Sequence, residues 1–196
     1  MKNKILSLFI LLISTSVLSS CGYNSLQGMD EDVKASWAEV QNQYQRRYDL
    51  IPNLVETVKG YAKHEKDTLE AVVKARAEAT QTKLEFNSLS DAKAFQKFEQ
   101  SQSGLTQALG KLMVVAEQYP DLKANSNFRD LQSQLEGTEN RIAVARKRYI
   151  EVVAEFNKGV RFFPTNMTAK YILHMEPKES FTVTTQEAKD APKIKF

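Results

Sequence analysis

The chain has 196 residues, of which 42% are hydrophobic and 26% are charged, a composition that suits one domain with a hydrophobic core. Its 27 Lys and Arg residues exceed its 24 Asp and Glu residues by three, but two of the lysines, Lys2 and Lys4, lie in the first 20 residues, which are predicted below to be removed. Without them the balance is 25 to 24, a net charge of +1, which argues against a nucleic acid as partner.

The first 20 residues have the order of an export signal. Lys2 and Lys4 give a positive start, residues 5–18 are mostly apolar, and small residues precede Cys21. This order is typical of a bacterial lipoprotein signal, so we predict that residues 1–20 are removed and that Cys21 carries a lipid anchor. Two alternatives remain open, an uncleaved membrane helix and plain secretion. The apolar run of 14 residues is short for a helix that needs about 20 to span a bilayer, and secretion would leave an unpaired thiol.

Apolar residues at steps of three and four predict a first long helix over residues 26–62. Pro52 lies inside the stripe, which stays in phase on both sides, so we expect a kink there rather than an end. The pattern thins after Gly60 and resumes from Leu69 to about Lys83. The stripe consists of Leu26, Met29, Val33, Trp37, Val40, Tyr44, Tyr48, Ile51, Val55, Val58 and Ala62.

A second helix is predicted from near Ser90 to Tyr119, with Ser88 and Asp91 as a variant capping box. Residues 100–103 make the middle of this helix polar. A connection of about six residues follows. The apolar stripe consists of Phe95, Phe98, Leu105, Leu109, Leu112 and Val115.

The third helix has the most regular periodicity, from an Asn127 cap through Phe128 to Phe163. This span of 36 residues corresponds to about 54 Å, and a helix that long packs well only against a partner of similar length. Short connections favour antiparallel neighbours, so the first helix is the expected partner. The predicted fold is therefore all-α, an elongated antiparallel bundle of three to four long helices with coiled-coil-like packing over residues 21–163.

The remaining residues, 164–196, are expected to form an irregular tail that is partly extended or disordered. A short helix is predicted around residues 168–173, and the patch at 181–185 favours extended chain. Disorder is expected from Glu176 onward.

Several longer stretches of the sequence identify a protein family, which the helical periodicity alone does not. They run in order through nearly the whole chain after Cys21, and they closely resemble the LemA family. The segments are RRYDLIPNLVETVKGYA at 46–62, YPDLKAN at 119–125, NF at 127–128, LQ at 131–132, LEGTENRIAVAR at 135–146, FPTN at 163–166 and APKIKF at 191–196.

This resemblance implies a membrane-attached, mostly helical bundle on the envelope side, without a settled biochemical activity. Related members are implicated in shaping magnetosome membranes, and others are found beside envelope proteases. The chain departs from the family at its lipoprotein-type start, where many members keep a membrane helix, and at residues 171–174, which replace a more glycine-aromatic segment. Gly22, rather than an aspartate, follows the cysteine; in enteric-type cells this favours the outer membrane, and the cell membrane remains the alternative.

A metal centre is not expected. Helical bundles that hold two irons use Glu-x-x-His pairs, whereas the residues three before His64 and His174 are Tyr61 and Tyr171. We predict no metal and no cofactor.

The candidate structural and interaction residues are mostly charged and lie in the family-like segments. We expect Glu139 and Arg146, or Arg46, Arg47 and Glu56, to form interhelical ion pairs that fix the register. The alternative is a site on the face from Glu136 to Arg146. The full set is Arg46, Arg47, Tyr48, Pro52, Asn53, Glu56, Glu136, Glu139, Asn140, Arg141 and Arg146.

Two glycines inside predicted helices, Gly60 and Gly137, suggest a close approach of two helices, or else a gap that fits a ligand. Trp37, Tyr44 and Tyr48 are expected in the core; the alternative is a partner-binding groove, should one face of the bundle lack a third long helix.

Two functions follow from these patterns. The favoured one is a lipid-anchored, non-catalytic helical module that binds another envelope protein or itself, or organises membrane. The alternative is an accessory factor or hydrolase that uses the carboxylate and arginine face.

Overall fold

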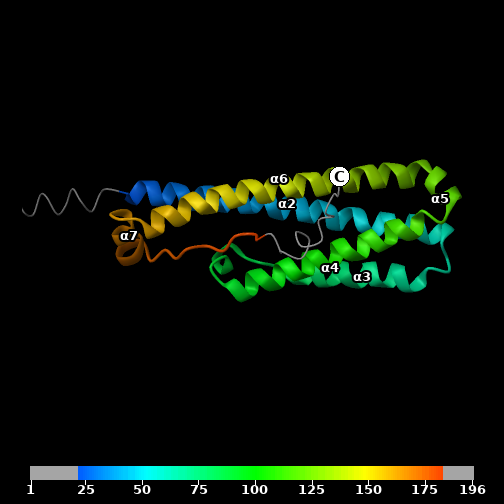
Figure 1. Ribbon diagram of the computed structural model, residues 1–196, viewed down its shortest axis with the longest axis horizontal. Helices are drawn as coiled ribbons and strands as arrows, with labels where there is room; N and C mark the ends of the chain where they lie inside the picture. Colours follow the sequence, from blue (N-terminus) through cyan, green and yellow to red (C-terminus); the bar gives the residue numbers. More distant parts are fainter. Residues whose placement is uncertain (1–21, 183–196) are drawn as a thin grey trace, which may run out of the picture.

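The computed structural model describes residues 22–182, and this part of the chain is all-α (Figure 1). The predicted fold class is confirmed. The signal at 1–20, Cys21 and the closing segment at 191–196 lie outside the described residues. The elements are α2 (Tyr23–Tyr61), α3 (Lys66–Gln81), η1 (Phe86–Ser88), α4 (Ala92–Ala116), α5 (Pro120–Ala124), α6 (Ser126–Arg161), α7 (Thr165–Thr168) and the π-helical turn η2 (Ala169–Leu173).

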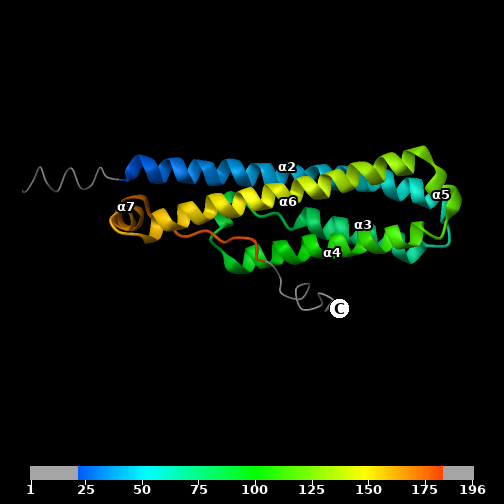
Figure 2. The same cartoon turned by 45° about the horizontal axis from the view of Figure 1, so that its top comes forward.

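Helices α2 and α6 lie side by side and antiparallel over their whole length, as their matching stripes predicted (Figures 1 and 2). Helices α3 and α4 form a shorter antiparallel pair that lies along one side of α2 and α6 toward the α5 end. The extended segment after η2 runs back along the bundle from the α7 end. The molecule is therefore elongated, with α5 at one end and α7 at the other.

Helix α2 continues through Pro52, as its unbroken stripe predicted. Proline has no N–H, so the carbonyl of Tyr48, four residues earlier, loses its helical partner. Nε of Arg76 on α3 donates a hydrogen bond to this carbonyl at 2.8 Å. A side chain of the neighbouring helix thus satisfies the acceptor that Pro52 leaves free.

Several predicted boundaries were wrong. The chain breaks at residues 62–65, so α3 is a separate helix, and residues 120–124 form α5 rather than a plain connection. Helix α4 ends at Ala116 instead of near Tyr119.

The predicted caps also need correction. Asp91 itself caps α4, accepting hydrogen bonds from the backbone N–H groups of Lys93 and Ala94. Asn125, not Asn127, caps α6, and it accepts from the N–H of Phe128. In both cases the side-chain oxygen reaches N–H groups of the first helical turn, which have no partner within the helix.

The prediction of disorder from Glu176 onward was wrong for residues 176–182. This stretch is extended and is hydrogen-bonded to the bundle. The Asn157 side chain donates to the carbonyl of Lys178 at 2.9 Å and accepts from its N–H at 2.8 Å. The N–H of Glu179 donates to the carbonyl of Leu89 at 2.7 Å, and the Tyr149 hydroxyl donates to the carbonyl of Glu179 at 2.9 Å.

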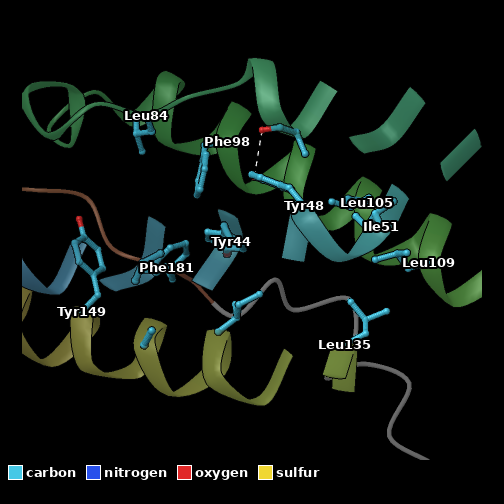
Figure 3. Packing of buried hydrophobic residues seen from close by; sticks show 14 of the residues in the cluster. Tyr44, Tyr48, Ile51, Leu84, Phe98, Leu105, Leu109, Leu135, Tyr149 and Phe181 are labelled. Carbon is cyan, nitrogen blue, oxygen red and sulfur yellow. Dashed lines mark hydrogen bonds between the residues drawn. The ribbon is translucent and has the colours of Figure 1, made fainter. Parts of the chain in front are cut away.

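An aromatic cluster forms the part of the core nearest this segment (Figure 3). The Phe181 ring lies 6.2 Å from the ring of Trp37, 5.1 Å from that of Phe95 and 5.6 Å from that of Tyr149. The indole N–H of Trp37 donates to the carbonyl of Leu84 at 3.1 Å. The extended segment thus closes the core with one aromatic side chain.

Trp37, Tyr44 and Tyr48 are only 2%, 3% and 7% exposed, so they are core residues, and the alternative of a groove on them is wrong. The predicted helix approach at the two glycines was also wrong. A Cβ on Gly60 would meet nothing within 4 Å, and one on Gly137 would meet only a side chain of its own helix. The close approach is instead at Gly159, where a Cβ would lie 3.0 Å from Sδ of Met29 on α2.

Candidate functional site

A buried arginine holds three helices together at the centre of the bundle. Arg47 on α2 is 1% exposed. Its Nη1 donates to Oε1 of Glu139 on α6 and to Oγ1 of Thr106 on α4, both at 3.1 Å. Its Nη2 donates to Oε1 of Gln102 on α4 at 2.5 Å. These four residues are called the central polar cluster below.

The cluster extends to α3 through a tyrosine. Nε2 of Gln102 donates to the hydroxyl of Tyr48 at 2.6 Å. That hydroxyl in turn donates to the carbonyl of Ala79 at 3.3 Å (Figure 3). The amide of Gln102 is therefore used at both ends, with its oxygen on Arg47 and its nitrogen on Tyr48. Such a buried network fixes the relative positions of the helices, because each polar atom would be costly to leave unpaired.

A pocket of about 500 Å³ lies beside the central polar cluster, between α4, α6 and the end of the extended segment. Arg146 and Glu99 face each other across it, with Nη2 to Oε1 at 3.7 Å. The Arg146 guanidinium also lies over the ring of Phe181, 4.3 Å from its centroid. Among residues 22–182, Nε of Arg47 is a buried donor without a hydrogen-bond partner.

Burial governs the electrostatics of this pocket. It raises the pKa of the Glu99 carboxyl, against the opposing effects of the Arg146 guanidinium and a hydrogen bond from the Thr182 backbone. Burial also raises the pKa of Tyr44 to about 12, although Arg146 and Arg47 lower it. The pKa of Tyr48 is raised by burial as well, against the hydrogen bond from Gln102.

A second hollow, of about 490 Å³, lies between α2 and α6, and we call it the outer groove. Val144 in it is 69% exposed, whereas Ala145 and Ser36 form a buried floor. It is lined by Ala35, Ser36, Glu39 and Gln43 of α2 and by Asn140, Arg141, Val144, Ala145 and Arg148 of α6.

The structure brings together only part of the predicted site residues. Arg47, Tyr48, Glu139 and Arg146 lie in or next to the central polar cluster and its pocket. Asn140 and Arg141 lie in the outer groove. Arg46, Pro52, Asn53, Glu56 and Glu136 are exposed elsewhere on the surface.

Arg47, Glu139 and Arg146 form interhelical ion pairs of the kind that the sequence predicted. The same expectation was wrong for Glu56, which pairs with Lys59 of its own helix at 3.4 Å. Glu136 accepts a hydrogen bond from Gln132 and does not line the pocket, so the predicted face from Glu136 to Arg146 does not form one site.

Sequence reasoning missed Glu99, Gln102, Thr106 and Phe181. A signal for Gln102 was present, because it occupies the stripe position between Phe98 and Leu105 in the polar middle of α4. A polar residue at a core position of a helix needs a buried partner.

No helix within residues 22–182 is long and apolar enough to cross a membrane. The same residues contain no group of three or more His, Cys, Asp or Glu side chains placed to hold a metal ion.

Comparison with known proteins gives a family and several distant relatives. A profile of the LemA family matches residues 36–196. Magnetosome protein MamQ 2 of Paramagnetospirillum magneticum is 26% identical over 163 residues, which cover 75% of this chain and 60% of the relative. Magnetosome protein MamQ of Magnetospirillum gryphiswaldense is 25% identical over 187 residues, covering 81% and 67%.

Protein LemA of Metamycoplasma hominis is 22% identical over 147 residues, covering 75% of this chain and 63% of the relative. The chain thus spans about 60% of the length of the MamQ 2 protein and less than two thirds of this LemA protein.

Proposed function

Because this chain belongs to the LemA family, we propose that it is a membrane-attached protein that acts by binding other proteins rather than by catalysis. The resemblance implies attachment to a membrane. The segment before Cys21 has the order of a lipoprotein signal, so we assign this attachment to a lipid on that cysteine. The bundle would then lie on the extracytoplasmic side.

The observation that supports a non-catalytic role is that the charged residues at the centre pair with one another between helices. Glu139 is paired with Arg47, and Glu99 is paired with Arg146. A carboxylate and a guanidinium that pair between two helices fix how those helices pack, a role that needs no exchange of protons. Both pairs join α6 to a different helix, so they act on the packing of the bundle.

The outer groove is the surface we assign to a protein partner. It lies on the two longest helices and bears charges of both signs, with Glu39 on α2 and Arg141 and Arg148 on α6. Val144, which also lines the groove and is exposed, offers an apolar contact beside these charges. A partner helix or loop with apolar and acidic side chains would complement this arrangement.

The test is photocrosslinking in living cells with a photoreactive amino acid in place of Val144. The matched control carries the same amino acid in place of Val114 on α4, which is 66% exposed, close to the 69% of Val144. We expect a reproducible protein adduct at 144 that is absent at 114. An adduct to a second copy of the chain would identify self-association, and equal labelling at both positions would contradict the assignment of the groove.

The second candidate function is a hydrolase or accessory enzyme at the pocket. The observation in its favour is Glu99, a carboxyl with a raised pKa in a pocket that also holds Arg146, which is a common setting for a general acid or base. The two functions differ in the effect of Glu99→Gln. A hydrolase would turn over a panel of chromogenic esters and peptides and would lose that turnover in the variant at unchanged stability. The binding role predicts no turnover and unchanged adducts at position 144.

A further inference from the structure

More than half of the large hydrophobic side chains that are exposed among residues 22–182 gather at the α7 end. Six large ones lie there, in the first residue of α2, the turn after α6, α7 and η2, and we call this surface the hydrophobic tip. Phe163 is the most exposed of them, at 83%. They are Tyr23, Phe162, Phe163, Met167, Tyr171 and Ile172.

Hydrogen bonds fold the turn after α6 into a defined shape. The Thr165 hydroxyl donates to the carbonyls of Gly159 at 2.6 Å and Phe162 at 2.9 Å, and the N–H of Asn166 also donates to the carbonyl of Phe162. The apolar side chains therefore stand on ordered backbone. Their exposure is a property of the fold, since Thr168 and Ala169 of the same turns are buried against the bundle.

The tip is also the place where the described chain begins. Gly22 lies against α7, because a Cβ at this position would be 2.7 Å from Cγ2 of Thr165. Figure 1 shows the first turn of α2 beside α7, at the end opposite α5. Gly22 is bonded to Cys21, the residue that we propose to carry lipid, so the anchor and the hydrophobic tip share one end of the molecule.

The charge of the tip fits a membrane surface. Residues 161–175 include Arg161 and Lys170, both exposed, and no Asp or Glu. Residues 22–29 carry no charged side chain, and the acidic residues of α2, Asp30, Glu31 and Asp32, begin about two helical turns away from its first residue. Aromatic and aliphatic side chains flanked by cations are the composition that settles into the headgroup region of an anionic bilayer.

We infer that the hydrophobic tip inserts into the headgroup region of the membrane that carries the anchor, and that Arg161 and Lys170 bind anionic phospholipid headgroups there. This inference rests on the membrane attachment proposed above. One lipid-modified residue alone would leave the bundle free to tilt, whereas a second contact beside it orients the long axis away from the membrane. The occupant of the tip is then lipid and not a protein.

The single tryptophan of the chain makes this testable. Trp37 is 2% exposed and gives a constant background. Phe163→Trp places a second indole on the tip, and Val114→Trp places one on exposed α4 as the matched control. The full chain, purified with its anchor, is reconstituted into vesicles of phosphatidylcholine and phosphatidylglycerol, with or without brominated acyl chains, and flotation measures attachment.

We expect the emission added by Phe163→Trp to shift to shorter wavelength and to be mostly quenched by the brominated lipid. The emission added by Val114→Trp should not be quenched. Quenching should be weaker in vesicles of phosphatidylcholine alone, and equal quenching would overturn the binding of anionic headgroups.

The remaining outcomes each reject a different claim. Flotation without quenching at position 163 overturns the inference alone and leaves the tip to a protein or a second copy. Quenching at both positions also overturns it, since the bundle then lies flat on the membrane. Failure to float overturns the proposed membrane attachment, and the inference with it.

Discussion

Arg47 shows, for a single residue, how a charge is kept inside this bundle. Its guanidinium is removed from water, and that loss is offset by four hydrogen bonds, two of them to the Glu139 carboxylate. The side chain of Glu139 is 37% exposed, so only the arginine bears the full cost of desolvation. The stability of the centre therefore depends on the arginine keeping its carboxylate.

Replacing Glu139 with alanine should destabilise the protein by about 3 kcal/mol, because the Arg47 charge would stay buried without compensation. Chemical unfolding followed by circular dichroism measures the change. Glu136→Ala, one turn earlier on the exposed face of α6, is the control and should lie within about 0.5 kcal/mol of the unmodified protein. An unaltered unfolding midpoint for Glu139→Ala would show that the pair contributes nothing.

Tyr44 is expected to make the free energy of unfolding of the protein decrease at alkaline pH. Burial raises its pKa to about 12 from 10.0. The folded state therefore prefers the neutral phenol, and the stability that this group contributes is complete below pH 10 and is lost between pH 10 and 12. Two pKa units correspond to about 3 kcal/mol. Tyr44→Phe should lose less stability than the unmodified protein between pH 8 and 12 in parallel unfolding titrations. Equal losses would contradict this role of the phenol.

Among the elements, α2 and α3 are joined where proline interrupts the hydrogen bonds of α2. The bond from Arg76 to the carbonyl of Tyr48 fills the position of the missing N–H of Pro52. A hydrogen bond from a charged donor contributes about 1.5–3 kcal/mol. The break at residues 62–65 turns the chain so that α3 can reach back to this point.

Arg76→Ala should therefore destabilise the protein by about 2 kcal/mol. In a Pro52→Ala background the restored N–H pairs with the Tyr48 carbonyl, and the same change at Arg76 should cost much less. A double-mutant cycle of unfolding free energies measures this coupling, with Lys74→Ala on the exposed face of α3 as control. Equal costs in both backgrounds would show that Arg76 acts through other contacts.

The extended segment after η2 contributes to the core mainly through Phe181, which is 6% exposed. Phe181→Ala should destabilise the protein by about 3 kcal/mol, the usual cost of truncating a buried phenylalanine. Because the Phe181 ring stacks near Trp37, the intrinsic fluorescence should also shift to longer wavelength. Thr182→Ala, at the exposed neighbour, should change neither property. A fluorescence spectrum unchanged by Phe181→Ala would mean that the segment does not cover Trp37.

The long elements could be predicted because a helical stripe needs only local periodicity, and the stripes of α2 and α6 are nearly unbroken. The break at residues 62–65 could not, since neither proline nor a turn sequence marks it beyond Gly60. The partners of Arg47 depend on how three helices are rotated about their axes, which periodicity does not give. Phe181 is one aromatic residue in a β-prone stretch, and nothing in its neighbours reveals that it faces Trp37.

For the whole molecule, the two ends differ in chemistry. The α7 end carries the hydrophobic tip, whereas the α5 end is polar. There the Asn125 side chain donates a hydrogen bond to the Tyr61 hydroxyl, and Lys123 forms an ion pair with Glu117. At the same end as the tip, the close contact at Gly159 brings α6 against Leu26 and Met29 of α2. The two ends of the elongated bundle can therefore bind different kinds of surface.

Replacing helical glycines that face open space with alanine is expected to raise the stability of the whole bundle. Gly28, Gly60, Gly104 and Gly110 lie in helices, and a Cβ there would meet nothing within 4 Å. Each change to alanine should add about 0.5–1 kcal/mol, and the four should be nearly additive because most are far apart. Thermal unfolding of single and combined variants tests this. Gly159→Ala should gain less or lose stability, and a gain equal to the others would contradict the close approach there.

The length of α2 has a consequence for where partners can meet the protein. With 39 residues, the helix rises about 58 Å from its first residue to its last. If the tip rests in the bilayer, the α5 end stands at about that height above the lipid, and the outer groove lies partway up. Proteins confined to the membrane surface would then be out of reach of α5, whereas those with tall domains, or those bridging from an opposing layer of the envelope, could contact it.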